Sequence, residues 1–272
     1  MIKLGHIIYS NCFPPHAGVV LKKIPFPFAL VEGIPTQLNS MLAEGTIDVS
    51  PSSSIEYAVH RRNYLLMPGL SITSKTRVMS ILLESKVPIE ELHDKIVALT
   101  TASATSVVLL RILLEIRSGV TPKYTMYEQG AEDPAERVDA LLTIGDLAIK
   151  RSMNSPFPHT YDLGALWNAF TDLPFVFALW QINYRKPIHK DLERLYDILM
   201  ESKAYGTARL QELATGNAAR FGLSADVLFE YWQLFSYDFS EPEKKGLMAF
   251  YGYAADLGVI EPVRDLSFWS RG

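Results

Sequence analysis

The chain has 272 residues, of which 48% are hydrophobic and 21% are charged, a composition typical of a globular protein with a substantial core. The formal net charge is −4, so the sequence lacks the basic surface that binding to nucleic acid or to anionic membranes requires. A single cysteine, Cys12, excludes an intrachain disulfide and a cysteine-based zinc cluster. An anionic ligand would therefore be held by a local site and not by the overall field.

The N-terminal residues show no charged segment followed by a long apolar stretch and a small-residue cleavage site. No run of the chain is apolar over enough residues to span a bilayer. We therefore expect a cytoplasmic protein without a membrane partner. A trimmed form of an exported protein would show the same pattern.

The first part of the chain alternates between strand and helix patterns. A strand is predicted over 2–9, and it ends at a polar turn because Pro14 and Pro15 have no N–H group to donate to a sheet. Predicted helices cover 35–43 and 55–61, and predicted strands cover 47–50 and 64–67. This alternation is typical of a mainly parallel sheet in an α/β fold.

A second set of strands and helices follows. We predict strands over 78–83, 95–99, 124–127 and 140–144, a short helix over 87–92, and helices over 107–116 and 145–150. The strand at 175–180 is expected to return to the first sheet. From about Ile188 onward the chain is expected to be nearly all helix, over 192–200, 207–213, 225–235 and 242–257. The pattern predicts a first lobe of residues 1–80 and 181–272 and an inserted lobe of residues 81–180, with the helical C-terminal segment packed on the first lobe.

Four polar turns follow predicted strands, at the edge where open α/β sheets bind ligands. The turn with Thr105 and Ser106 opens a helix, whose positive end would suit a carboxylate or a phosphate. An ordinary Ser/Thr helix cap explains this pattern equally well. The same two interpretations apply to the cluster Ser52-Ser53-Ser54, where the cap is slightly favoured. The turns at Asn11 and at Gly145-Asp146 also have local explanations, since Asn suits turns and Asp caps helices.

Other candidates for chemistry are weaker. Cys12 has no histidine partner implied by the sequence, and a small buried thiol is the commoner role. His6 falls inside a strand, where packing or pairing is expected, and His16 is a weak acid–base candidate. The sequence has no GxGxxG motif, no P-loop and no metal-ligand spacing.

Several segments, taken in order, resemble the chorismate dehydratases of the futalosine route to menaquinone. They are residues 5–14 (GHIIYSNCFP), 34–39 (IPTQLN), 42–49 (LAEGTIDV), 53–57 (SSIEY), 85–88 (SKVP), 102–106 (ASATS), 142–146 (LTIGD) and 173–180 (LPFVFALW). The likeness runs over nearly the whole chain. No single segment is decisive, but the ordered set is quite specific.

The resemblance implies a two-lobed fold of the type II periplasmic-binding-protein kind that closes over its ligand. It implies a hydro-lyase, a carbon–oxygen lyase that removes water from chorismate to give 3-[(1-carboxyvinyl)oxy]benzoate without a metal or an organic cofactor. The residues that the resemblance implies at the cleft are Asn11, Ser53, Ser80, Thr105, Ser106 and Asp146. Of these we expect Asn11 and Ser80 to be catalytic, and we expect Ser53, Thr105, Ser106 and Asp146, with the adjoining Ser54, to bind the substrate.

Two segments depart from the family pattern. Thr76-Arg77 stand where the family usually has Gly-Pro, and Ser50-Pro51-Ser52-Ser53 stand where it tends to have Ala/Gly-Pro-Ile-Ser. Three alternatives stay open: a binding protein for a small organic anion, the sister dihydroxynaphthoate synthase, and a ligand-sensing domain of a regulator. A homodimer is compatible with the sequence, which does not determine the oligomeric state.

Overall fold

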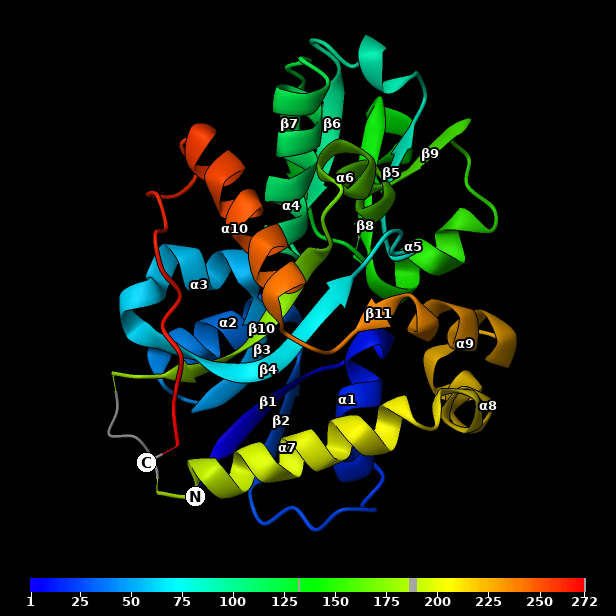
Figure 1. The fold of residues 1–272 in the computed structure, drawn as a ribbon. Helices are drawn as coiled ribbons and strands as arrows, with labels where there is room; N and C mark the ends of the chain where they lie inside the picture. Colours follow the sequence, from blue (N-terminus) through cyan, green and yellow to red (C-terminus); the bar gives the residue numbers. More distant parts are fainter. Residues whose placement is uncertain (132, 186–189, 272) are drawn as a thin grey trace. The chain divides into compact units, whose positions relative to one another are not determined.

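The computed structural model describes residues 1–131, 133–185 and 190–271, which form two compact units (Figure 1). Unit 1 contains Met1–Thr73, Val176–Ser240 and the segment from Arg264 onward, and unit 2 contains Ser74–Phe175 and Glu241–Val263. The expected divisions at 80/81 and 180/181 differ from these boundaries by a few residues. Ile188, where the helical region was expected to begin, lies outside the described residues.

Unit 1 is built on a mixed sheet with the strand order β11-β4-β10-β3-β1-β2 among the described residues. Strand β1 pairs in parallel with both β2 and β3, whereas β10 pairs antiparallel with β3. The sheet is mixed because β10 returns from unit 2 and enters in the opposite direction. The strands are β1 (Lys3–Ile7), β2 (Ala29–Gly33), β3 (Val49–Ser53), β4 (Tyr64–Ser74), β10 (Phe175–Asn183) and β11 (Phe235–Ser236).

Helix α1 (Phe13–Val20) occupies a segment where the two prolines predict a turn, so this prediction is wrong. Pro14 and Pro15 lie in its first turn, where amide groups have no intrahelical acceptor and proline costs nothing. Helix α7 (Leu192–Thr207) packs along α1. A Cβ on Gly206 of α7 would overlap the backbone carbonyl of Pro14, so only glycine allows the two helices to approach this closely.

Helices α2, α3 and α9 agree with the predicted segments to within two residues, whereas α8 begins three residues later and ends eight residues later than predicted. Helix α2 packs on β1 and β3, and α8 packs on α9. Helix α2 ends at Gly45, whose φ of 73° suits the left-handed position after a helix. These helices are α2 (Pro35–Glu44), α3 (Ser54–His60), α8 (Leu210–Phe221) and α9 (Ala225–Gln233).

Unit 2 has a five-stranded sheet, within the described residues, in the order β7-β6-β8-β5-β9. Strand β6 pairs in parallel with β7 and β8, while β5 pairs antiparallel with β8 and β9. The strands are β5 (Ile81–Ser85), β6 (Ile96–Thr100), β7 (Lys123–Tyr127), β8 (Ala140–Ile144) and β9 (His159–Asp162). Strand β9 and the helix after it were not predicted.

The last helix, α10 (Glu241–Asp256), is part of unit 2 and not of the unit that carries α7, α8 and α9. The sequence pattern predicts that all of 181–272 belongs to the first lobe. The reason for the difference is an aromatic cluster, in which Phe250 of α10 packs edge-on to Phe175 and Trp167 at 4.9 and 6.3 Å between ring centroids. Unit 2 also holds α4 (Ala104–Arg111), the π-helical turn Ile112–Arg117, α5 (Gly145–Ser152) and α6 (Leu163–Thr171).

No helix in the described part of the chain is both long and apolar enough to cross a membrane.

Candidate active site

In unit 1 the sheet topology brings Asn11 and Ser53 to one edge. Strands β1 and β3 are adjacent and parallel, so the turn after β1 and the end of β3 lie at the same carboxyl edge. Asn11 lies in the short 3-10 turn Ser10–Cys12 that follows β1, and Ser53 is the last residue of β3. The predicted residues of this unit therefore share the edge where ligands of α/β sheets bind.

The turn at Asn11 is held from behind by two aromatic side chains. The Trp232 indole Nε1–H donates to the carbonyl of Ser10 at 2.8 Å, and the Tyr237 hydroxyl donates to the carbonyl of Asn11 at 2.9 Å. Burial raises the pKa of Tyr237 far above its usual range, with a smaller contribution from Cys12, so this hydroxyl keeps its proton. The amide oxygen Oδ1 of Asn11 is buried and has no hydrogen-bond partner among the described residues. A buried acceptor without a donor is costly, and a ligand hydroxyl would satisfy it.

Ser53 is also fixed from a neighbouring element. The Asn39 amide Nδ2 of α2 donates to Ser53 Oγ at 2.9 Å, and the Ser53 amide donates to Asn39 Oδ1 at 3.4 Å. Ser53 occupies the cap position of α3, yet its side chain makes no cap hydrogen bond. The simple cap interpretation is therefore wrong for Ser53. Ser54, the first residue of α3, is fully buried.

In unit 2 the predicted residues again converge on one edge. Strands β6 and β8 are parallel neighbours, so Thr105 after β6 and Asp146 after β8 lie at the same edge. Strand β5 runs antiparallel to β8 with Ile81 opposite Ile144, so its start, next to Ser80, lies there too. The Gly145 amide donates to the carbonyl of Ser80 at 2.7 Å and joins the two turns directly.

Thr105 and Ser106 are buried in the first turn of α4. The helix is capped by Ser103, whose Oγ accepts from the Ser106 amide at 3.3 Å and lies 2.9 Å from the Ser106 hydroxyl. The cap that the sequence allowed is thus present at Ser103, two residues before Thr105. The Ser106 amide therefore already donates a hydrogen bond within the protein, to Ser103.

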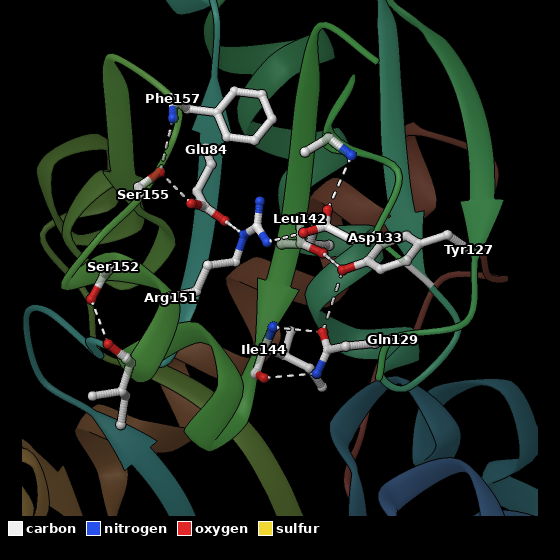
Figure 2. A network of polar contacts seen from close by, with 12 residues as sticks. Glu84, Tyr127, Gln129, Asp133, Leu142, Ile144, Arg151, Ser152, Ser155 and Phe157 are labelled. Carbon is white, nitrogen blue, oxygen red and sulfur yellow. Dashed lines mark hydrogen bonds and ion pairs between the residues drawn. The ribbon is translucent and has the colours of Figure 1, made fainter. Parts of the chain in front are cut away.

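Asp146 lies in the first turn of α5, whose N-cap position is occupied by Ile144. Its carboxylate lies near the positive end of the helix, where negative charge is favoured. The preceding residues are braced by Gln129, whose side chain accepts from the Ile144 amide and donates to the Ile144 carbonyl, both at 2.9 Å (Figure 2). Gln129 therefore fixes the end of β8 immediately before Gly145 and Asp146.

The two histidines of the first segment form a buried pair. His6 Nδ1 and His16 Nδ1 lie 2.7 Å apart, and the His16 ring packs edge-on to Trp180 at 5.4 Å. Burial, and then the charge of Arg220, lower the pKa of His6 to about 4; burial and then His6 lower the pKa of His16 well below its usual value. Pairing was expected for His6. His16 is buried in the core and not placed as an exposed acid–base group.

Several residues that fix the predicted positions were not found from the sequence: Asn39, Gln129, Asp162, Trp232 and Tyr237. Only Asp162 carried a local signal, since it precedes an apolar helical segment as a cap residue does. Two hollows of unit 2, of about 300 and 550 Å³, are lined by other residues, among them Tyr127, Thr143 and Arg151 in the first and Lys86 and Phe157 in the second. Within the described residues, His, Cys, Asp and Glu form no group of three or more that could hold a metal ion.

The fold and the polar residues at the carboxyl edges of its two sheets define an α/β protein of the periplasmic-binding-protein class. Among solved structures, the chain is similar to a protein from Archaeoglobus fulgidus, with a TM-score of 0.77, 19% identity, and coverage of 95% of this chain and 98% of the other. It is also similar to an alkanesulfonate-binding protein from Xanthomonas axonopodis pv. citri bound to MOPS, with a TM-score of 0.68, 18% identity and coverage of 95% and 93%.

The family is narrower than the fold class. The family model described as menaquinone biosynthesis matches residues 2–256, and the chain belongs to this family. It is 35% identical over 262 residues to the chorismate dehydratase of Thermus thermophilus, covering 91% of this chain and 93% of that protein. It is 30% identical over 194 residues to the chorismate dehydratase of Campylobacter jejuni, covering 69% and 70%.

Proposed function

We propose that this protein is a chorismate dehydratase, a carbon–oxygen lyase that converts chorismate to 3-[(1-carboxyvinyl)oxy]benzoate and water. The observation that carries the proposal is the 35% identity over 91% of the chain to the chorismate dehydratase of Thermus thermophilus. We also propose a cytoplasmic location, since the family serves a biosynthetic pathway. The proposed reaction uses no metal and no organic cofactor.

The main task of the protein in this reaction is to hold the substrate in the reactive orientation. Loss of the ring hydroxyl as water, with one ring proton, turns the cyclohexadiene into an aromatic ring, so the reaction is strongly downhill. The protein then needs to orient the departing hydroxyl and assist one proton transfer. Chorismate carries two carboxylates, and these need hydrogen-bond donors once they leave water.

The site residues are assigned on this basis. Thr105 and Ser106, in the first turn of α4, receive a carboxylate together with the positive end of that helix. Asn11 and Ser80 orient the ring and its hydroxyl. The unpartnered, buried Oδ1 of Asn11 supports this role, because it is an acceptor that a substrate hydroxyl would complete. Ser53, Ser54 and Asp146 are assigned to substrate binding because they lie at the carboxyl edges of their sheets.

The decisive experiment mixes the purified full-length protein with chorismate and follows both chorismate and the enolpyruvyl benzoate by chromatography. Enzyme-dependent formation of that product is expected. Tight binding of chorismate without turnover would instead indicate a binding protein, and neither binding nor turnover would overturn the proposed substrate. Formation of that product would also distinguish this protein from the sister synthase, which acts on a cyclic futalosine.

A second assay tests the role of Asn11. Asn11→Ala should lower kcat far more than it weakens chorismate binding, because the proposed contact aligns the departing hydroxyl. Asn154→Ala changes the same side chain at an exposed position of unit 2 and serves as the matched control. Equal turnover of Asn11→Ala and Asn154→Ala would remove Asn11 from the reaction.

A further inference from the structure

Ser80 follows a backbone turn that a side chain far along the chain holds in place. The turn centres on Met79, whose φ of 58° lies in the left-handed region. The Ser80 amide donates back to the Val78 carbonyl at 2.7 Å, which is the hydrogen bond of a three-residue γ-turn. A γ-turn with positive φ is the rare and strained form, and a methionine gains nothing locally from adopting it. Something outside the turn must therefore hold it.

The carboxylate of Asp162 supplies that restraint. Its Oδ2 accepts from the Met79 amide at 2.7 Å and from the Val78 amide at 2.9 Å, and its Oδ1 lies 3.0 Å from the Val78 amide. The same Oδ1 accepts from the Ala165 amide at 3.0 Å and so caps α6. Hydrogen bonds to an ionised carboxylate are about twice as strong as neutral ones, so one side chain can outweigh the strain at Met79.

Close packing supports the same arrangement. Asp162 lies opposite Leu82 in the pairing of β9 with β5, which brings its side chain to the beginning of β5. Gly164, in the first turn of α6, allows the preceding loop to approach, since a Cβ there would lie 3.0 Å from the Thr76 carbonyl oxygen. The start of α6 and the 74–80 loop are thus in direct contact. A strand was predicted over 78–83, but it begins only at Ile81. The amides of Val78 and Met79 donate to Asp162 and not to a neighbouring strand.

The turn is also joined to the other predicted residues of unit 2. The Ser80 carbonyl accepts from the Gly145 amide, which precedes Asp146. A change in the Met79 turn would therefore move Ser80 and release the Gly145 amide together. We propose that Asp162 is a positioning residue that fixes Ser80 for the dehydration by holding Met79 in the left-handed conformation, an inference that rests on the proposed role of Ser80.

The test separates this restraint from the helix cap. In Asp162→Ser the shorter side chain can still cap α6, as serine does at many helix starts, but it is too short to hold the amides of both Val78 and Met79. We expect kcat for chorismate to fall by about tenfold or more with a smaller change in KM. Ser224→Ala, which removes the serine cap of α9 in unit 1, is the matched control and should leave kcat unchanged.

A second substitution distinguishes loss of the positioning role from a general loss of folding. Adding Met79→Gly to Asp162→Ser removes the cost of positive φ, so the double variant should regain part of the lost kcat. Amide hydrogen exchange gives a second readout that does not depend on turnover: exchange should become faster at Met79 and Gly145 in Asp162→Ser and not in Ser224→Ala.

The outcomes are distinct. If the native protein does not turn over chorismate, the proposed function fails and the exchange result alone decides whether Asp162 holds the turn. If the native protein is active but Asp162→Ser keeps its kcat, or shows unchanged exchange at Met79 and Gly145, the positioning role is overturned.

Discussion

The Tyr237 hydroxyl donates a 2.9 Å hydrogen bond to the backbone carbonyl of Asn11, although the two residues are 226 positions apart. The Ser10 carbonyl beside it accepts from Trp232 in the same way. Both contacts are made by backbone carbonyls, and the side-chain Oδ1 of Asn11 has no hydrogen-bond partner among the described residues. The placement of Asn11 depends on residues that are remote in sequence.

Tyr237→Phe should lower both stability and turnover. The substitution leaves the partly buried Asn11 carbonyl without its donor, and losing such a hydrogen bond costs about 1 kcal/mol. The free energy of unfolding, measured in urea, should fall by that amount, and kcat should fall with it. Tyr124→Phe removes a phenol hydroxyl that donates to Glu115 in unit 2, away from the predicted residues, and should leave kcat unchanged. Equal kcat values for the two variants would contradict the role of Tyr237.

Stability should depend on pH through the buried histidine pair. Histidine ordinarily titrates near 6.5, and burial lowers the pKa of His6 to about 4. Between these values the unfolded chain binds protons that the native chain does not, so the free energy of unfolding falls as the pH is lowered through this window. The loss from His6 alone is on the order of 3 kcal/mol at the lower end.

Removing both histidines tests this dependence without leaving one ring unpaired. The double variant His6→Leu/His16→Phe should flatten the fall in stability between about pH 6.5 and 4, measured by urea unfolding at several pH values. His60→Gln changes a histidine whose side chain is 45% exposed and serves as the control variant. A native slope in the double variant would show that other groups cause the acid dependence.

The sequence predicted the elements that are apolar and regular, and it failed where distant contacts decide. Strands β6 and β8 are nearly all buried and were predicted within one residue. Strand β2 was missed because three of its residues are half-buried and one is exposed, so buried and exposed positions do not alternate along it. Helix α1 was missed because its two prolines were interpreted as the end of a strand, although proline is also suited to the first turn of a helix.

The same division holds for the site. Turns after strands could be located from the sequence because the pattern of strands determines the edge of the sheet. The left-handed conformation of Met79 could not, since the side chain that stabilises it, Asp162, is 83 residues away. The unpartnered state of Asn11 Oδ1 likewise depends on how the surrounding chain packs.

Gly206 should be essential for packing α7 on α1. Gly206→Ala places a methyl group against the Pro14 carbonyl, which cannot move without shifting the start of α1. We expect a loss of about 1–3 kcal/mol in the free energy of unfolding, as for other overpacked sites. Gly216→Ala in α8 meets nothing within 4 Å and should be neutral or stabilising by up to about 1 kcal/mol. Equal effects of the two alanines would show that helix propensity, and not close approach, determines the choice of glycine.

The buried ion pair in unit 2 should matter more than any exposed pair. Arg151 Nε lies 2.5 Å from Glu84 Oε2, and its Nη1 lies 2.5 Å from Asp133 Oδ2 (Figure 2). The Glu84 side chain is fully buried and also accepts from the Ser155 hydroxyl. Without Arg151, the buried Glu84 carboxylate would lose its positively charged partner and keep only the hydrogen bond from Ser155.

Arg151→Met keeps much of the side-chain length and removes the charge, so we expect a loss of about 3–5 kcal/mol in the free energy of unfolding. Lys244→Met breaks the exposed pair with Glu241, where solvent weakens the interaction, and should change stability by less than about 1 kcal/mol. Both values come from urea unfolding at neutral pH. A loss for Arg151→Met no larger than that for Lys244→Met would mean that water reaches Glu84 and that the pair contributes little to unit 2.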